Sequence, residues 1–378
     1  MTDHDHFDVA IIGGGLAGLT LSIQLCNAGY SVILFEKEKY PFHKVCGEYI
    51  SNESRKFLTR LGVDSIEDLP QITKLIVSSP SGAILKSDLD SGGFGISRYK
   101  LDNKLADIAR SAGVKVCEQT KVTNVTFKKD LLTVSAGTKN INCKVVAGTF
   151  GKRSNLDVKW NRSFIKEKNN KLNNYVGIKY HIITNHAADT IALHNFNNGY
   201  CGISQIEDKK YCLCYLTKAQ NLKDNNNSIP ELEKNVLYKN PHLKEIFTTS
   251  KFLFESPVTI SQISFQNKKL IEDHILMIGD AAGMITPLCG NGMSMAMHGS
   301  KIAFECINDF LQNKISRTQM EATYQTRWSK QFSGRLRFGR ILQSIFGKDR
   351  MTNIFIGLIK KIPFLKKKLI RATHGQPF

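Results

Sequence analysis

Cys46 stands among ionisable side chains in the stretch YPFHKVCGEYIS, which spans residues 40–51. His43 and Lys44 precede it, and Glu48 follows two residues later. A neighbouring cation lowers the pKa of a thiol and increases its reactivity. One interpretation is therefore a catalytic Cys46, redox-active or proton-donating. The other is a small side chain that lines a pocket, and the sequence leaves both open.

The nine cysteines of the chain are scattered, with no C-x-x-C pair and no spacing typical of a zinc site. We therefore expect no metal site. The first residues, MTDHDHFD, include acidic groups and no apolar run, which is unlike a signal peptide. Reduced thiols and a cytoplasmic protein are the resulting expectation.

Three glycines, Gly13, Gly15 and Gly18, have the spacing G-x-G-x-x-G. An apolar run over residues 8–12 predicts a strand before them, and helical periodicity over 16–27 predicts a helix after them. In such a unit the glycines allow a tight turn, close approach of a pyrophosphate, and close packing of helix on strand. Free N–H groups at the helix N-terminus attract the phosphates. The motif therefore predicts a dinucleotide site.

Glu36 ends a second strand, which is predicted over residues 31–35. A carboxylate at this position can accept hydrogen bonds from the ribose hydroxyls of adenosine. It favours a free 2′-hydroxyl, as in FAD or NAD, over a 2′-phosphate.

A second glycine-rich segment follows an apolar run over residues 275–278. It begins with Gly279 and Asp280 and leads to a helix that is predicted to start near Gly292. Asp280 could bind a sugar-alcohol chain, and the backbone of residues 287–293 could lie against a flat ring. A helix N-terminus at Gly292 would stabilise negative charge on a reduced ring, which favours a flavin.

Together, the glycine motif with its distal Glu36, the segment ISRYKLDNKLADIARSAG and the segment GDAAGMITPLCGNGMSMAM resemble the FAD-binding architecture of the para-hydroxybenzoate hydroxylase superfamily. K-V-C-G-E at residues 44–48 is similar to its geranylgeranyl reductase and FixC-like dehydrogenase branch. The resemblance covers most of residues 7–310 and is loose over 156–269. It implies FAD contacts at Gly13, Gly15, Leu16, Ala17, Gly18, Glu36, Lys37, Lys44, Cys46, Gly47, Arg98, Gly279, Asp280, Pro287, Gly290, Asn291, Gly292 and Met293.

The chain departs from this superfamily at several positions. Phe150 stands where many hydroxylases have the aspartate of G-A-D-G. The W-x-W-x-I-P segment of flavin halogenases is absent, since the only tryptophans are Trp160 and Trp328, and halogenation is not expected. The Y-x-W-x-F-P segment of geranylgeranyl reductases is reduced to YCGIS at residues 200–204. Geranylgeranyl chains are therefore only one candidate substrate.

The predicted fold is α/β, with a Rossmann-type, glutathione-reductase-like FAD-binding domain and an inserted, mainly antiparallel β-sheet domain for the substrate. A helical segment forms the C-terminus. Alternating apolar strands separated by turn residues predict the inserted sheet. The predicted boundaries are 1–75, 96–155 and 270–310 for the discontinuous FAD-binding domain, 76–95 and 156–269 for the substrate domain, and 311–378 for the helical region.

Positive charge is concentrated at the C-terminus of the chain. The net charge is +19, and residues 335–378 contain eleven Lys or Arg and one acidic residue. Basic and apolar residues alternate there as in an amphipathic helix that lies on an anionic membrane. The alternative is a helix that covers the core. No nucleic-acid-binding motif is present, so nucleic acid is not a predicted partner.

The sequence favours an FAD-dependent oxidoreductase of the reductase or dehydrogenase type. Its substrate is predicted to be hydrophobic, such as a prenyl, polyketide or lipid-like molecule, from the basic C-terminal segment and the apolar middle strands. NAD(P)H or another donor would reduce the flavin. One alternative is an FAD-dependent NAD(P)H monooxygenase of an aromatic or polyketide substrate. The other is a flavin-bearing, membrane-associated binding protein without turnover.

Overall fold

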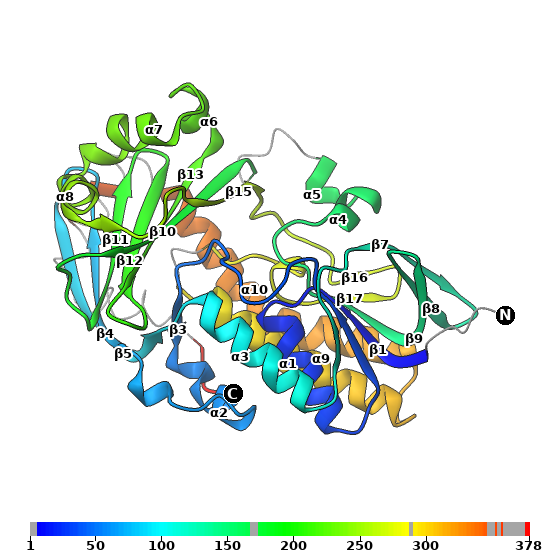
Figure 1. The fold of residues 1–378 in the computed structure, drawn as a ribbon. Helices are drawn as coiled ribbons and strands as arrows, with labels where there is room; N and C mark the ends of the chain where they lie inside the picture. The colour runs from blue at the N-terminus through cyan, green and yellow to red at the C-terminus, as the bar shows by residue number, and fades with distance from the viewer. Residues whose placement is uncertain (1–5, 167–172, 287–289, 346–351, 354–356, 358–374) are drawn as a thin grey trace.

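Two β-sheets and the helices that cover them make up the protein (Figure 1). The computed structural model describes residues 6–166, 173–286, 290–345, 352–353, 357 and 375–378. The mixed α/β fold predicted from the sequence is confirmed.

The first sheet contains the parallel strands of the predicted Rossmann unit. Its main order is β16-β17-β9-β1-β2-β6, in which β1 pairs in parallel with both β2 and β9. All four residues of β2 are buried, as is usual for a parallel sheet covered on both faces. The strands are β1 (His6–Ile12), β2 (Val32–Phe35), β6 (Lys115–Cys117), β7 (Val122–Lys128), β8 (Leu131–Ala136), β9 (Lys139–Gly148), β16 (Ile271–Glu272) and β17 (Ile275–Met277).

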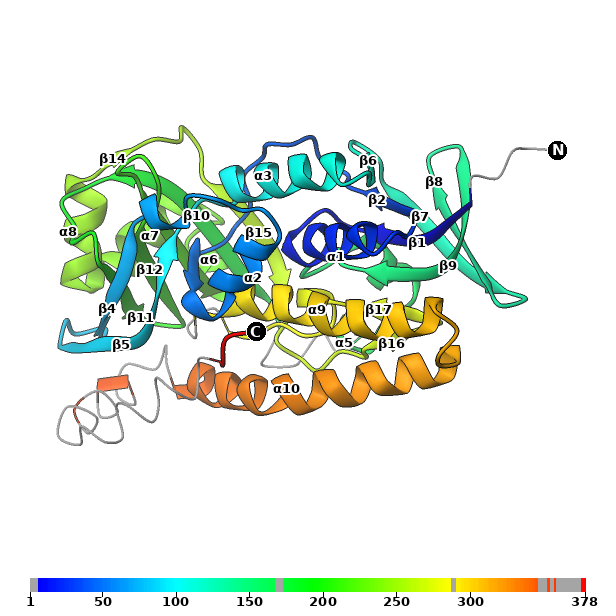
Figure 2. The same cartoon turned by 90° about the horizontal axis from the view of Figure 1, so that it is seen from below.

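Four long helices lie side by side near this sheet: α3 (Arg98–Ser111), α1 (Leu16–Asn27), α9 (Gly292–Leu311) and α10 (Arg317–Ile345) (Figure 2). The helix predicted over residues 16–27 is confirmed at both ends. A hydrogen bond of 2.7 Å between Thr20 Oγ1 and Ser300 Oγ joins α1 to α9. Tyr324 Oη of α10 donates to the carbonyl of Met277 over 2.6 Å, which ties α10 to the end of β17.

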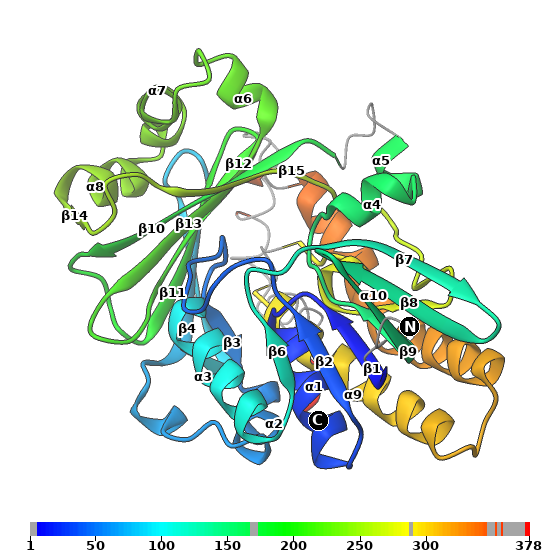
Figure 3. The same cartoon turned by 45° about the vertical axis from the view of Figure 1, so that its right-hand side comes forward.

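The second sheet has nine strands and is mainly antiparallel, as predicted, with one parallel pair between β11 and β4. Figure 3 shows its green strands to the upper left of the blue strands β1 and β2. Strands β3 and β4 belong to this second sheet, although residues 1–75 are predicted to belong to the FAD-binding domain. The strands are β3 (Tyr49–Ser51), β4 (Gln71–Ser78), β5 (Ile84–Gly95), β10 (Tyr175–Ile183), β11 (Thr190–Phe196), β12 (Gly199–Gln205), β13 (Tyr211–Lys218), β14 (Lys251–Phe252) and β15 (Val258–Ile263).

The two faces of the second sheet differ in chemistry. Side chains alternate along a strand, and Ile178, Tyr180 and Ile182 of β10 pack in one apolar cluster with helices on the outer face. Lys179 and His181 point to the opposite face, toward the segment that follows β2. Much of the apolar strand pattern therefore serves the packing of helices. These helices are α6 (Ala219–Lys223), α7 (Ile229–Asn235) and α8 (Pro241–Thr249); the remaining short helices are α2 (Arg55–Arg60), α4 (Asn155–Lys159) and α5 (Ser163–Lys166).

The C-terminal region begins with α10, which packs on α9 through Trp328 and Phe332. Of the basic segment predicted as an amphipathic helix, residues 335–345 lie in α10, where Leu336 and Leu342 are buried. Residues 346–351, 354–356 and 358–374 lie outside the described residues. Within the described part of the chain, no helix is both long and apolar enough to cross a membrane.

Candidate active site

The first glycine motif adopts the geometry that its spacing predicts. Gly13 has a φ of +108°, which side chains disfavour, and a Cβ there would lie 2.7 Å from the Cα of Phe150. A Cβ on Gly18 would lie 2.1 Å from the carbonyl of Gly13, so helix α1 can pack on β1 only without a side chain. No described side chain caps the N-terminus of α1, where Gly15 is the N-cap residue. Its first N–H groups can therefore bind a phosphate.

Glu36 is buried at the end of β2 and is fixed by two main-chain donors. Its Oε2 accepts from the N–H of Gly14 over 2.9 Å, and its Oε1 accepts from the N–H of Glu38 over 3.1 Å. Each carboxylate oxygen has a second lone pair that can accept from a ribose hydroxyl. Lys37, by contrast, has a side chain that is 67% exposed and lies 3.6 Å from Glu38. Its predicted contact with the cofactor stays a prediction.

Lys44, Arg98 and Asp102 form an ion-paired group next to the glycine motif, which we call the cofactor-side cluster. Arg98 donates from Nε and Nη2 to the two oxygens of Asp102, each over 2.7 Å. Lys44 Nζ donates to Asp102 over 2.9 Å and to the carbonyl of Gly14 over 3.3 Å. Burial raises the pKa of Asp102, but Arg98 and Lys44 outweigh it and hold the pKa below its usual value. The cluster places two cations beside the predicted pyrophosphate site.

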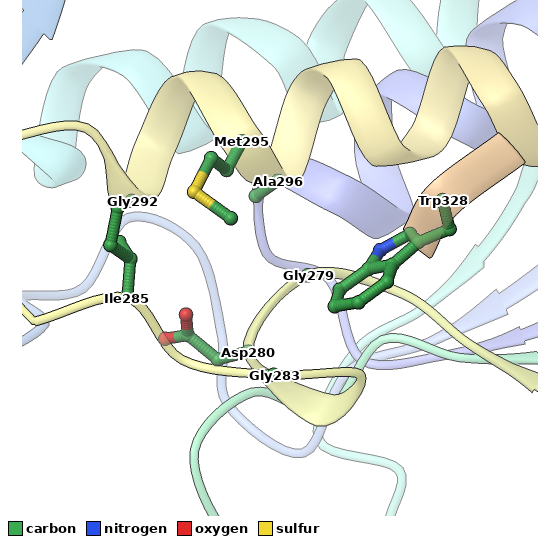
Figure 4. A pocket seen from close by; sticks show the side chains of 8 residues that line it. All are labelled: Gly279, Asp280, Gly283, Ile285, Gly292, Met295, Ala296 and Trp328. Atoms are coloured by element: carbon green, nitrogen blue, oxygen red, sulfur yellow. The ribbon is translucent and has the colours of Figure 1, made fainter. Parts of the chain in front are cut away.

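The second glycine segment lies where β17 gives way to a turn of 3-10 helix at Gly279–Ala281. Helix α9 begins at Gly292, with Asn291 as its N-cap residue, and no described side chain caps this helix end. A small hollow lies between this turn and α9, with Asp280, Met295 and Trp328 in its wall (Figure 4).

The remaining predicted contacts in this segment are placed as follows. Met293 is 7% exposed and belongs to the hydrophobic core, so its position fits packing. Gly290 has a φ of +65°, which suits glycine. The main chain of Asp280 is fixed by Lys268, whose ammonium donates to the Asp280 carbonyl over 2.7 Å. Pro287 lies outside the described residues.

These parts fit an FAD molecule. Helices α1 and α9 lie side by side, and each begins at one of the two glycine segments (Figure 2). Their free N–H groups suit a pyrophosphate and an anionic ring edge. Glu36 suits the ribose and Asp280 the sugar-alcohol chain between them. The structure thus brings together the described members of the predicted set from residues 13–18, 36, 44–46, 98, 279–280 and 292.

Cys46 lies in the loop after β2 and is partly exposed. Its thiol interacts with the guanidinium of Arg98, which places it at the edge of the cofactor-side cluster. Its main-chain carbonyl accepts from Cys212 Sγ over 3.2 Å, on the other side of the loop. The two interpretations of this residue, a reactive thiol and a pocket wall, both fit this position.

Glu48, Lys179 and His181 form a second ionic group, which we call the sheet-side cluster. Lys179 Nζ lies 2.5 Å from Glu48 Oε1, and His181 Nε2 lies 2.6 Å from Glu48 Oε2. Glu48 and Lys179 are fully buried. Burial raises the pKa of Glu48, but the ammonium of Lys179 and the hydrogen bond to His181 lower it by more. The net effect is a pKa below the ordinary value.

The same cluster has the composition of a metal site, because Glu48, His181 and Cys212 offer ligand atoms within 4.8 Å of one another. Two nitrogen or oxygen ligands on a tetrahedral ion are roughly 3.3 Å apart, given bonds of about 2.0 Å. The 2.6 Å between Glu48 and His181 is a hydrogen-bond distance, and Lys179 already supplies the cation. The geometry is that of an ion-paired carboxylate.

Sequence reasoning missed Asp102, Lys179 and His181 as members of the site. Asp102 was detectable, since it stands four residues after Arg98 on a predicted helix and such pairs lie on one helix face. Lys179 and His181 carry a weaker signal, namely two basic residues at alternate positions of an otherwise apolar strand. Nothing in their local sequence connects them to Glu48, which lies more than 130 residues away.

Comparison with known proteins identifies a family. A family model described as an FAD binding domain matches residues 6–327. The chain is 25% identical over 364 residues to conditioned medium factor receptor 1 of Dictyostelium discoideum, which covers 87% of this chain and 69% of that protein. It is 22% identical over 391 residues to a digeranylgeranylglycerophospholipid reductase of Methanosarcina acetivorans, covering 97% of this chain and 91% of that protein.

Solved structures share the fold. A flavin-dependent brominase superimposes with a TM-score of 0.79 at 19% identity, covering 97% of this chain and 93% of that one. The relatives include halogenases as well as reductases, for example a chlorinase of Pseudomonas fluorescens that is 24% identical over 357 residues, covering 83% of this chain and 78% of that protein.

Proposed function

Starting from the fact that this chain belongs to the FAD binding domain family and is an FAD-dependent oxidoreductase, we propose that it is a reductase of a hydrophobic, prenyl- or lipid-like substrate. NAD(P)H is the proposed reductant. Bound FAD would supply the electron-transfer chemistry, while the chain binds and orients it and keeps water from the reacting atoms.

The observation that carries the proposal is the placement of the K-V-C-G-E stretch. Residues 44–48 resemble the geranylgeranyl reductase branch, and they lie between the cofactor-side cluster and the second sheet. Cys46 interacts there with Arg98, so it stands at the predicted flavin site. The reductase of Methanosarcina acetivorans, which matches nearly the whole chain, supports the same assignment.

A hydrophobic substrate is supported by one end of the inner face of the second sheet. Tyr175 of β10, Tyr200 of β12 and Leu216 of β13 are buried there, in the same apolar cluster as the cofactor-binding sheet. This apolar end adjoins the polar end formed by Lys179 and His181. In the proposed complex, a lipid-like chain would lie along this apolar end, with its polar group toward the cofactor side. The basic segment at residues 335–378 supports a substrate that is taken from a membrane surface.

Anaerobic turnover of the FAD-loaded protein tests the proposal. NADPH and a digeranylgeranylglycerophospholipid would be supplied without oxygen, and the lipid would be analysed by mass spectrometry. Gain of two hydrogens per double bond is the expected result. Gly18→Val is the matched control, because a side chain there would collide with the carbonyl of Gly13 and is expected to disrupt the cofactor-binding turn.

Other outcomes would overturn the proposal in different directions. Oxygen-dependent addition of one oxygen atom to an aromatic or polyketide substrate would identify a monooxygenase. A kynurenine 3-monooxygenase of Christiangramia forsetii, 24% identical over 335 residues and covering 80% of this chain and 72% of that protein, makes this the second candidate. Bound flavin that no pyridine nucleotide reduces, with no turnover of any substrate class tried, would favour a binding protein.

A further inference from the structure

The segment Lys44–Gly47, which we call the KVCG loop, is held by hydrogen bonds to its main-chain carbonyls. All four carbonyls accept a hydrogen bond from a side chain, and all four donors come from residues 152–212, far along the chain. The pairs are Lys179 Nζ to Lys44 O over 3.2 Å, Lys152 Nζ to Val45 O over 3.0 Å, Cys212 Sγ to Cys46 O over 3.2 Å, and Ser204 Oγ to Gly47 O over 3.3 Å. Three of the donors lie on the second sheet.

Glu48 closes this loop and is the most restrained residue of the group. Its φ is +55°, in the left-handed region that a glutamate adopts only when surrounding contacts compensate the cost. Its carboxylate accepts from Lys179 and His181, and also from the N–H of Arg98 over 2.8 Å. Its carbonyl accepts from the N–H of Ile96 over 3.1 Å.

These contacts connect the second sheet to the cofactor side. Lys179 touches both Glu48 and the first carbonyl of the KVCG loop. Glu48 in turn touches the first residue of α3, Arg98, whose guanidinium pairs with Asp102. A displacement of the Glu48 carboxylate would therefore reach Arg98 through one hydrogen bond, and the KVCG loop through Gly47 and through the bond from Lys179 to the Lys44 carbonyl.

We propose that Glu48 is a positioning residue for the FAD site, and that its buried pair with Lys179 fixes the KVCG loop and Arg98 in their cofactor-binding positions. The proposal rests on membership of the FAD-binding family and is independent of whether the reaction is a reduction or an oxygenation. A loop ordered before FAD arrives loses less conformational entropy on binding, so its affinity for FAD is higher.

Glu48→Gln tests this role, with Glu233→Gln as the matched control. Glu233 is a second buried glutamate next to β10, but it accepts from Tyr180 and Tyr215 on the outer face of the sheet, away from the KVCG loop. The FAD dissociation constant would be measured by quenching of flavin fluorescence on titration into apoprotein. We expect Glu48→Gln to weaken FAD binding at least ten-fold and Glu233→Gln to change it less than two-fold.

A readout without FAD separates positioning from general stability. Hydrogen exchange of the peptide that covers residues 43–49 would be measured in the apoproteins of wild type, Glu48→Gln and Glu233→Gln, without denaturant. We expect faster exchange in Glu48→Gln and unchanged exchange in Glu233→Gln. Equal losses of FAD affinity in both variants, or unchanged exchange and affinity in Glu48→Gln, would overturn the proposal.

The double variant E48Q/K179M serves if Glu48→Gln alone fails to fold. It removes both charges together and leaves no unpaired buried ion, which proteins tolerate far better than the loss of one partner. The bond from Lys179 to the Lys44 carbonyl is also lost in it, so at least ten-fold weaker FAD binding is again expected. Wild-type affinity in a folded double variant would contradict the positioning role. Failure of the reductase assay in a protein that binds FAD normally would contradict the proposed function and leave the positioning role of Glu48 unaffected.

Discussion

The cofactor-side cluster and the sheet-side cluster have the same composition but different surroundings. Each joins one carboxylate to two basic side chains, and the main-chain N–H of Arg98 connects the two clusters by donating to Glu48. In the first, Lys44 and Arg98 keep 23% and 12% of their side-chain surface exposed. In the second, Lys179 and Glu48 have none. The difference matters because solvent screens charges at the first cluster, whereas each charge of the second depends on its partner.

Their positions in the chain differ as well. Arg98 and Asp102 are four residues apart on one helix, so most of the cofactor-side cluster forms when α3 forms. Lys179 and Glu48 are brought together only when the second sheet packs on the KVCG loop. The first cluster is suited to meeting an anionic ligand, and the second to holding two parts of the molecule together.

Lys179→Met should have the largest effect. It leaves the buried Glu48 carboxylate without its ammonium partner, and loss of one member of a buried pair costs roughly 3–5 kcal/mol. The free energy of unfolding, measured by urea denaturation of the apoprotein, should fall by about that amount. A loss below about 1 kcal/mol, the contribution of an exposed surface pair, would contradict the dependence of Glu48 on Lys179.

Asp102→Asn should cost less, because Arg98 and Lys44 retain contact with water and Lys44 also lies 4.0 Å from Glu36. We expect a loss of roughly 1–3 kcal/mol in unfolding free energy, the range for a removed hydrogen bond to charged groups. FAD affinity should also fall, since Arg98 loses the carboxylate that orients it. A destabilisation equal to that of Lys179→Met would erase the distinction between the clusters.

Acid should weaken the sheet-side cluster. The pKa of Glu48 is lowered from its ordinary value of 4.5, so its contribution to stability is complete above about pH 4.5 and is lost as pH falls through the folded-state pKa. Lys179, His181, Cys212 and the N–H of Arg98 face this carboxylate. The difference in unfolding free energy between wild type and Glu48→Gln should therefore shrink below pH 4.5. A difference that stays constant to pH 3 would contradict the assigned charge of Glu48.

His43 also changes its protonation in acid, in a pH range that overlaps that of Glu48. For this reason the prediction compares the Glu48→Gln variant with wild type. Burial, with Lys179 and His181 nearby, lowers the pKa of His43 from 6.5 to about 4. Its neutral form therefore favours folding above pH 6.5, and this contribution falls as pH drops toward 4. The double variant H43F/E48Q, compared with H43F alone, should show the same change below pH 4.5.

Lys100→Ala is the smallest expected effect and the reference for both clusters. Lys100 pairs with Asp208 over 3.0 Å, and both side chains are about half exposed, at 48% and 49%. Such pairs contribute roughly 0–1 kcal/mol. Unfolding free energy and FAD affinity should both stay within error of wild type. A large loss would mean that exposure is a poor guide to the contribution of ion pairs in this protein.

Local pattern was enough to predict the elements that carry the cofactor residues. The helix over residues 16–27 and the start of α9 at Gly292 were predictable, because apolar periodicity and glycine spacing are read within one short window. The strand pattern between residues 175 and 218 predicted the second sheet but not which face meets the cofactor domain. The apolar middle strands were one basis for the predicted hydrophobic substrate, but Ile178 of β10 packs against the helices on the outer face.

The sequence by itself determined that this protein has a dinucleotide site with an acidic residue after the second strand, and that its chemistry is that of a flavoprotein. It also drew attention to YPFHKVCGEYIS as part of the site. Only the tertiary structure decided that the carboxylate of Glu48 is buried there, and that its partners are Lys179 and His181. The physical reason is the distance along the sequence over which each interaction acts. Glycine turns and helix caps depend on neighbouring residues, whereas a buried charge is tolerated only where the folded chain places an opposite charge beside it.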